Sequence, residues 1–231
     1  MSEAAKEVRR ERPVRGPRIP PGLGRFQDLA RAIGGWAFRW HAGLRVFGRE
    51  HVPRSGPLIL AANHRSMLDI PLLVLASPRR VHFMAKSVIF RGPISTRFFQ
   101  GLGGFRVRRE IVDVRAMDVA LAILERGDVL GIYPEGTRSR TGEMKEFLGG
   151  TAWLALKTGA PIVPCGIVGT EMGTRAKGFL GRLGLPPLRR RVRITFGPPI
   201  LVERDLSPRA RKEKAPAITG RLLGEIVRLA S

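Results

Sequence analysis

Residues 57–69 read Pro57-Leu58-Ile59-Leu60-Ala61-Ala62-Asn63-His64-Arg65-Ser66-Met67-Leu68-Asp69, an apolar run that leads directly into a cluster of polar side chains. A continuous apolar run of this length is typical of a strand buried on both faces, as in a parallel sheet. Ligands bind beyond the carboxyl ends of the strands in such sheets. The stretch therefore predicts a buried strand that ends near Asn63 and a functional site just after it.

His64 and Asp69 are the candidate proton-transfer pair in this stretch. A neutral histidine can accept a proton from a hydroxyl near neutral pH, and a carboxylate can orient its ring and stabilise the imidazolium. Five residues subtend about 500° on a continuous helix, so His64 is expected to precede the helix that follows. The alternative is structural, because Ser66 followed three residues later by Asp69 resembles a helix-capping box.

Composition indicates one basic domain. The 231 residues are 43% hydrophobic, with 41 Lys plus Arg against 19 Asp plus Glu and a formal net charge of +22. This charge favours an anionic partner, and a nucleic acid, a phospholipid surface and a phosphorylated substrate all qualify. Aromatic residues make up 6% of the chain, with one Tyr, so the stacking side chains of a single-strand nucleic-acid binder are scarce. This weakens the nucleic-acid interpretation without excluding it, and no nucleic-acid partner is expected. One Cys, Cys165, excludes an intramolecular disulfide, and no Cys/His cluster has metal-ligand spacing.

The N-terminal region divides into two parts. Residues 1–22 are rich in Arg and Pro and predict a disordered basic tail, and residues 23–231 are expected to form a single domain. From Arg25 to Phe47, apolar residues at helical spacing predict an amphipathic helix with arginines on the opposite face. Such a helix can lie in a membrane interface or pack on the protein core. No apolar stretch is long enough to span a bilayer, and no signal peptide is expected.

Further strands and helices alternate along the chain. A second polar motif, residues 134–138, again follows an apolar strand, and its glycine, threonine and arginine suit phosphate binding or an ordinary surface turn. The remaining expectations are strands at 81–85, 105–109, 129–133, 161–167 (at a sheet edge or a sheet end because of its prolines) and 192–196, helices at 113–127, 151–157 and 207–230 (interrupted at Pro216), and a basic loop or short helix at 175–193. The pattern predicts an α/β fold, with a mainly parallel central sheet flanked by helices.

Four blocks make the sequence resemble the 1-acyl-sn-glycerol-3-phosphate acyltransferase family over about residues 44–200. They are residues 63–69, which resemble the family's Asn-His-x4-Asp block, and residues 104–109, 134–138 and 160–164. The resemblance makes His64 and Asp69 the catalytic dyad. It assigns to the phosphorylated acceptor Lys86, Arg109, Glu135, Gly136, Thr137 and Arg138. The fourth block is associated with the acyl side.

The resemblance implies direct acyl transfer from acyl-CoA or acyl carrier protein to the free hydroxyl of 1-acyl-sn-glycerol 3-phosphate, giving phosphatidic acid. The acyl thioester is a co-substrate, and neither a cofactor nor a metal is implied. The expected location is the cytoplasmic face of the membrane, with the stretch from Arg25 to Phe47 as a peripheral attachment. Two alternatives stay open. The acceptor can be glycerol 3-phosphate or another lysolipid, or the chain can be a basic nucleic-acid-binding protein.

Overall fold

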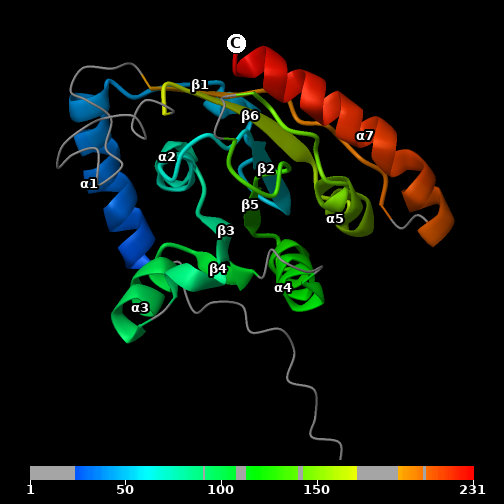
Figure 1. Ribbon diagram of the computed structural model, residues 1–231, viewed down its shortest axis with the longest axis horizontal. Helices are drawn as coiled ribbons and strands as arrows, with labels where there is room; N and C mark the ends of the chain where they lie inside the picture. Colours follow the sequence, from blue (N-terminus) through cyan, green and yellow to red (C-terminus); the bar gives the residue numbers. More distant parts are fainter. Residues whose placement is uncertain (1–23, 91, 108–112, 140–142, 171–191, 205–206) are drawn as a thin grey trace, which may run out of the picture.

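The protein is built on one seven-stranded sheet with helices on both faces (Figure 1). The computed structural model describes residues 24–90, 92–107, 113–139, 143–170, 192–204 and 207–231. The helices are α1 (Arg25–Ala42), η2 (Arg49–His51), α2 (Asp69–Ala76), η3 (Ser87–Ile89), α3 (Pro93–Gly101), α4 (Val114–Glu125), α5 (Gly150–Thr158) and α7 (Pro208–Leu229). The strands are β1 (Arg45–Phe47), β2 (Leu58–Ala62), β3 (Val81–Lys86), β4 (Gly104–Val107), β5 (Val129–Ile132), β6 (Ile162–Val168) and β7 (Arg193–Phe196).

The sheet is mainly parallel, as the sequence predicts. Its order is β1-β7-β6-β2-β5-β3-β4, and β6 with β7 is the antiparallel pair. In the centre, β5 lies between β2 and β3 and is parallel to both. Their carboxyl ends therefore open at the same edge of the sheet, which brings together the loops that follow Ala62, Lys86 and Ile132.

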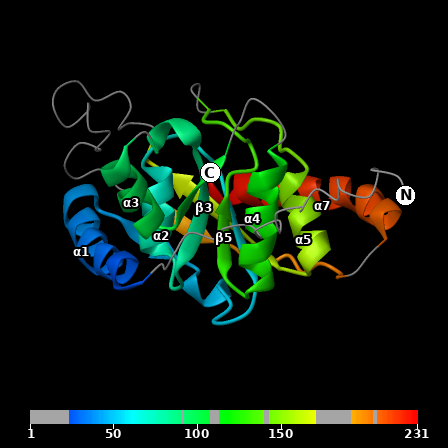
Figure 2. The same cartoon turned by 90° about the horizontal axis from the view of Figure 1, so that it is seen from below.

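Alternation along β2 explains the two layers of helices. Leu58, Leu60 and Ala62 belong to a core shared with α2, whereas Ile59 and Ala61 belong to a core shared with α4, α5 and α7. Successive strand side chains point to opposite faces, so an all-apolar strand must be covered on both sides. Figure 2 shows α1, α2 and α3 on one side of the strands and α4, α5 and α7 on the other.

The N-terminal helix is shorter than the stripe of apolar residues suggests. α1 ends at Ala42, and Arg45 to Phe47 form the edge strand β1, which pairs with β7. Leu44 is buried, so it is part of the core and not of an exposed helical stripe. Among the described helices, none combines the length and hydropathy of a bilayer-spanning segment.

Two expectations drawn from prolines, the edge position for β6 and the break at Pro216, are wrong. β6 is an inner strand between β2 and β7, not an edge strand. Pro164 keeps one bond to the neighbouring segment, since its carbonyl accepts from Gly197 N–H just beyond the last residue of β7. Its missing N–H falls between the end of the β7 ladder and the isolated bridge of Ile162 with Ile200. Pro216 does not interrupt α7, since it lies on an exposed turn where water can satisfy the freed carbonyl. The predicted tail (residues 1–22) and residues 175–191 of the basic run lie outside the described residues.

Candidate active site

His64 and Asp69 form a buried pair at the carboxyl end of β2. His64 Nδ1 lies 2.9 Å from Asp69 Oδ2, and both side chains are almost fully buried. His64 lies in the loop before α2, and Asp69 is the first residue of that helix, as five-residue spacing requires. Because a carboxylate accepts at Nδ1, the ring proton sits there and Nε2 is left with a free lone pair. The pair has the arrangement of a general base and its orienting carboxylate.

Asp69 also organises the loop that carries His64. Its Oδ2 accepts from the backbone N–H groups of Arg65 (2.6 Å) and Ser66 (2.7 Å), as well as from His64. The bond from Ser66 N–H matches one half of the predicted capping box, but α2 begins at Asp69 and its N-cap is Leu68, with no side-chain cap bond, so Ser66 does not cap this helix. Within the described residues, the buried Oδ1 has no hydrogen-bond partner.

The loop after β5 holds the backbone of His64 at two points. Glu135 Oε1 accepts from His64 N–H (2.8 Å), and Ser139 N–H donates to the His64 carbonyl (2.8 Å). Glu135 is buried, and its Oε2 accepts from Lys145 N–H (3.3 Å). Parallel pairing of β2 with β5 brings these two loops side by side. The carboxylate of Glu135, predicted to contact substrate, is therefore bonded to two backbone N–H groups.

Gly136 is required by the turn in this second loop. Its φ is +66°, and a Cβ at this position would lie 2.7 Å from Leu148 Cδ1. A residue with a side chain would be strained there and would collide with its neighbour. Thr137 and Arg138, which follow, are exposed.

Two side chains that sequence reasoning gave no role also position the dyad. The Tyr133 ring stacks on the His64 ring, with centroids 4.2 Å apart and planes inclined by 26°. Burial and the charge of Asp69 raise the pKa of Tyr133 well above its usual range, so its hydroxyl stays neutral. Asn63 bridges to β6 through both amide atoms, accepting from Ile167 N–H (2.7 Å) and donating to its carbonyl (2.8 Å). Each contact joins residues more than 60 positions apart, so no local motif signals it.

An apolar cavity of about 630 Å³ opens beside the dyad. Among the described residues that line it, three are polar: His64, Lys86 and Arg138. The apolar wall comes from α1, α2, β3, η3 and α3: Phe26, Ala30, Gly34, Met67, Ile70, Pro71, Val74, Leu75, Phe83, Ala85, Ile89, Phe98, Phe99 and Leu102. The contribution of α3 was not predicted, although Pro93 at its first turn and the pair Phe98-Phe99 signal an apolar helix there. The arrangement places a base and two cations beside a space suited to an apolar chain.

The other predicted residues are placed as follows. Lys86 is exposed at the end of β3. Arg109 lies outside the described residues. Cys165 is fully buried, and burial raises the pKa of its thiol, so it is a core residue without nucleophilic character. In the described part of the chain, no three His, Cys, Asp or Glu side chains are grouped closely enough to hold a metal ion.

Comparison with known proteins identifies similar chains. The family model described as Acyltransferase matches residues 43–168, which include the dyad and both loops around it. The chain is 31% identical over 136 residues to the 1-acyl-sn-glycerol-3-phosphate acyltransferase of Borreliella burgdorferi, covering 57% of this chain and 54% of that protein. It is 29% identical over 132 residues to the enzyme of the same name from Bacillus subtilis, and this match covers 57% of this chain and 65% of that protein. The chain thus spans less than two thirds of either relative's length.

A solved structure is similar over most of the chain. The crystal structure of the 1-acyl-sn-glycerophosphate acyltransferase PlsC from Thermotoga maritima superimposes with a TM-score of 0.66 at 26% identity. The match covers 86% of this chain and 78% of the other. The likeness therefore extends well beyond residues 43–168.

Proposed function

The chain belongs to the acyltransferase family, and on that premise we propose that it transfers a fatty acyl group from an acyl thioester to the free hydroxyl of 1-acyl-sn-glycerol 3-phosphate, giving phosphatidic acid. The observation that carries the proposal is the apolar cavity whose polar lining consists, among the described residues, of His64, Lys86 and Arg138. A base, an apolar space and two cations are what an acyl chain and a phosphorylated alcohol require. The donor is acyl-CoA or an acyl carrier protein.

The proposed reaction needs one proton transfer in each direction. His64 Nε2 takes the hydroxyl proton as the acceptor oxygen attacks the thioester carbonyl, and the imidazolium returns that proton to the departing thiolate. Asp69 keeps the ring oriented and stabilises the imidazolium through Nδ1. A thioester is already activated, so no covalent acyl-enzyme is needed. Glu135 positions His64 through its backbone, since both of its oxygens accept from N–H groups.

The acceptor's phosphate is assigned to Lys86 and Arg138, with Arg109 as a third cation from the family resemblance. Arg138 follows the tight turn at Gly136, so its guanidinium is carried on a loop that also holds the His64 backbone. A planar guanidinium suits bidentate bonds to phosphate, and Lys86 adds a point charge. Binding the phosphate on this loop would fix the acceptor hydroxyl relative to Nε2.

Peripheral attachment to the cytoplasmic face of a membrane is part of the same proposal. The outward side of α1 exposes large apolar side chains, of which Trp36 is 69% and Trp40 is 80% exposed. Ile94 and Phe98 of α3 are exposed as well, and Phe98 contacts Phe26 of α1 edge to face. We call the exposed apolar residues of these two helices the apolar face: Phe26, Leu29, Ile33, Trp36, Trp40, Ile94 and Phe98. Tryptophans on an amphipathic helix are typical of interfacial binding.

The experiment that tests the proposal is an acyl-transfer assay with a panel of acceptors and donors. The acceptors are 1-acyl-sn-glycerol 3-phosphate, glycerol 3-phosphate and other lysophospholipids, each offered with acyl-CoA and with acyl carrier protein, and products are identified by mass spectrometry. Phosphatidic acid as the main product supports the proposal. A different main product would keep the reaction class and change the acceptor, and no acyl transfer with any pair would refute it.

Replacing Arg138 with alanine is expected to weaken binding of the phosphorylated acceptor far more than binding of the acyl donor. A charge-assisted contact to phosphate is worth about 1.5–3 kcal/mol, so KM for the acceptor should rise about 10- to 150-fold with little change for the thioester. The matched control is Arg221→Ala, because Arg221 is an exposed arginine of α7 on the opposite face of the sheet. An effect confined to the donor would mean that Arg138 serves the thioester.

Gly34→Leu is expected to shift donor preference towards shorter acyl chains. A Cβ on Gly34 would already lie 3.0 Å from Leu75 Cδ2, and both residues line the apolar cavity, so a leucine side chain must occupy cavity space. Each methylene that no longer fits should lower kcat/KM about fourfold, from about 0.8 kcal/mol per CH₂. The measurement compares palmitoyl with decanoyl thioesters. The control is Gly35→Leu, at a position with no atoms within 4 Å of an added Cβ and outside this cavity.

A further inference from the structure

Tyr133 lies at a fixed position against the ring of His64. It follows the last residue of β5, and because β5 pairs in parallel with β2, with Ile132 opposite Ala61, its side chain reaches the loop beyond β2. The two rings lie nearly face to face, with centroids 4.2 Å apart and planes inclined by 26°. The Tyr133 carbonyl also accepts from Gly136 N–H (2.9 Å), which fixes its backbone at the start of the turn. The contact is therefore set by the strand pairing that forms the site.

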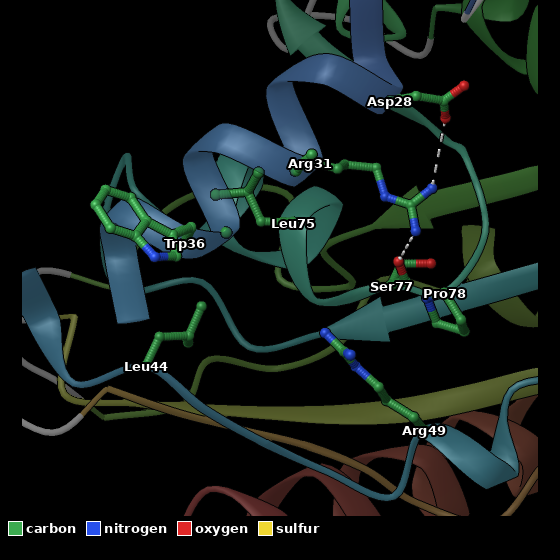
Figure 3. Close-up of a pocket in the computed structure, with 10 residues that line it drawn as sticks. Asp28, Arg31, Trp36, Leu44, Arg49, Leu75, Ser77 and Pro78 are labelled. Carbon is green, nitrogen blue, oxygen red and sulfur yellow. Dashed lines mark hydrogen bonds and ion pairs between the residues drawn. The ribbon is translucent and has the colours of Figure 1, made fainter. Parts of the chain in front are cut away.

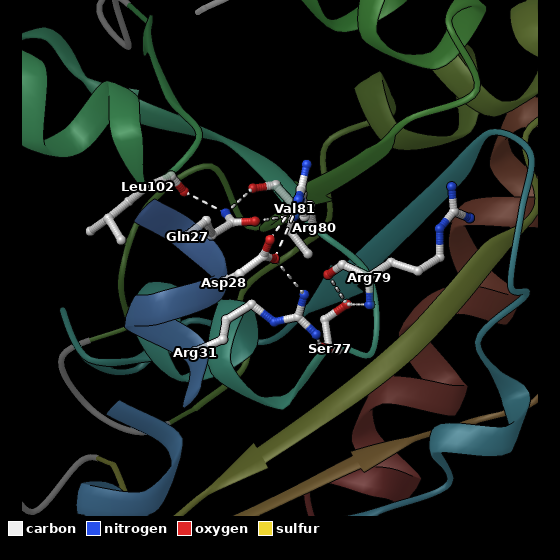
Figure 4. A network of polar contacts seen from close by, with 8 residues as sticks. All are labelled: Gln27, Asp28, Arg31, Ser77, Arg79, Arg80, Val81 and Leu102. Carbon is white, nitrogen blue, oxygen red and sulfur yellow. Dashed lines mark hydrogen bonds and ion pairs between the residues drawn. The ribbon is translucent and has the colours of Figure 1, made fainter. Parts of the chain in front are cut away.

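The hydroxyl of Tyr133 does not explain this position. It is buried, and within the described residues it has no hydrogen-bond partner. Polar side chains elsewhere on this side of the sheet are bonded to the protein, as Figure 4 shows for the amide of Gln27 and Figure 3 for the guanidinium of Arg31. Tyr133 is also not among the described residues that line the cavity beside His64, so its hydroxyl is not placed to contact a substrate. What this residue presents to the site is the face of its ring.

The cavity side of His64 is unfavourable for a positive charge on its ring. Lys86 and Arg138 line the same cavity as this ring, so two cations would repel the imidazolium. Asp69, which is bonded to the ring, supplies one compensating charge. An aromatic face is the negative part of a quadrupole, and it attracts a cation that lies within about 6 Å of its centroid. At a centroid distance of 4.2 Å, the ring of Tyr133 meets this condition for the imidazolium.

We propose that Tyr133 is a positioning residue for acyl transfer, whose ring face stabilises the imidazolium of His64 and holds the plane of that ring. The inference rests on the proposed function, since the imidazolium forms when His64 takes the proton of the acceptor hydroxyl. A neutral imidazole gains less from the aromatic face, so the contact stabilises the transition state more than the bound substrates. Changes at Tyr133 should therefore alter kcat and leave the KM of both substrates nearly unchanged.

The test replaces the side chain at position 133 in the full chain and measures acyl transfer in a single turnover. Tyr133→Leu should lower the rate about 5- to 30-fold, the fold-change that corresponds to about 1–2 kcal/mol for a desolvated contact between a cation and an aromatic face. Tyr133→Phe keeps the ring face and should keep the rate. It also removes a buried hydroxyl without a partner, so its thermal midpoint of unfolding should not fall. A phenylalanine variant as slow as the leucine variant would assign the role to the hydroxyl and overturn the proposal.

Fluorinated phenylalanines at position 133 separate electrostatics from packing. A singly and a triply fluorinated phenylalanine keep the shape of the ring nearly unchanged, but they withdraw electron density from its face. The rate should therefore fall with each added fluorine, while KM stays constant. A merely structural contact would give equal rates across this series, and that result would overturn the proposal. Because the ring is retained, the series decides the question even if Tyr133→Leu does not fold.

The matched control is Phe196→Leu. Phe196 is a fully buried aromatic residue of the same core layer, and it does not line the cavity beside His64. Its replacement should lower the midpoint of unfolding and leave the rate unchanged when transfer is measured well below that midpoint. A loss of rate equal to that of Tyr133→Leu would show a general effect of core packing and overturn the proposal.

A readout without turnover tests the contact itself. A ring stacked on His64 shields the proton on Cε1 of the imidazole, so the magnetic-resonance signal of this proton should move downfield in Tyr133→Leu and stay in place in Tyr133→Phe. No movement in the leucine variant would show that the rings do not stack and would overturn the proposal. The two proposals also fail differently. An unmodified chain without acyl transfer refutes the proposed function, whereas transfer that is insensitive to residue 133 refutes the role of Tyr133 alone.

Discussion

Replacing His64 with alanine is expected to lower the rate of acyl transfer by about 10²- to 10⁴-fold, which is the usual contribution of a general base. The substitution removes the ring contacts to Asp69 and Tyr133, but the fold should survive because two backbone bonds of this residue remain: its N–H donates to Glu135 and its carbonyl accepts from Ser139 N–H. Asp69 would keep its two bonds to Arg65 and Ser66. The substitution therefore removes the base and leaves its frame.

The measurement is single-turnover acyl transfer together with the thermal midpoint of unfolding. A suitable control is His51→Ala. His51 is the last residue of η2, its ring bonds to the carbonyl of Phe196 in β7, and it does not line the cavity beside His64. Its rate should equal that of the unmodified chain. Turnover within a few-fold of normal in a folded His64→Ala protein would remove His64 from the mechanism.

The central strands and the dyad were predictable from sequence because their signals are local. β2 is a continuous apolar run, and a polar motif follows it directly, so one window of residues contains both the strand and its site. The same holds for β5 and the loop of residues 134–138. The cap of α4 was predictable for the same reason, since the Asp113 carboxylate accepts from the N–H of Ala116, only three residues later.

What could not be predicted depends on pairing between distant segments. Glu135 was assigned to substrate because it lies in a motif, and the bond that its carboxylate accepts from His64 N–H could not be predicted because it depends on the pairing of β2 with β5. Tyr133 reaches the His64 ring across the same strand pair. The edge position expected for β6 is wrong because the cost of a proline depends on which neighbouring strand its missing N–H faces. The sequence does not show that neighbour, which is the segment at the end of β7. The C-terminal boundary predicted for the first helix is wrong because an apolar residue such as Leu44 fits both a helical stripe and the buried residue before a strand.

Asp69→Asn is expected to separate the charge of this residue from its geometry. Three donors converge on Oδ2: the His64 ring, Arg65 N–H and Ser66 N–H. Two of them are backbone groups that cannot move away, so the amide oxygen of asparagine must take the position of Oδ2 and accept all three bonds. The His64 tautomer is then retained, but no negative charge stabilises the imidazolium. The rate should fall by about 10²- to 10⁴-fold.

The same substitution has a calculable effect on stability. The asparagine NH₂ would occupy the position of Oδ1, which has no partner among the described residues, and burying an unpaired donor costs about 1–3 kcal/mol. The matched control is Asp113→Asn, which changes the aspartate that caps α4. It should leave both rate and stability nearly unchanged because Asn caps as well as Asp. Rates are measured well below the midpoint of unfolding of each variant. If Asp69→Asn lost stability but kept its rate, Asp69 would be a cap alone, and the imidazolium would have to be stabilised by the donors and cations of the bound substrates.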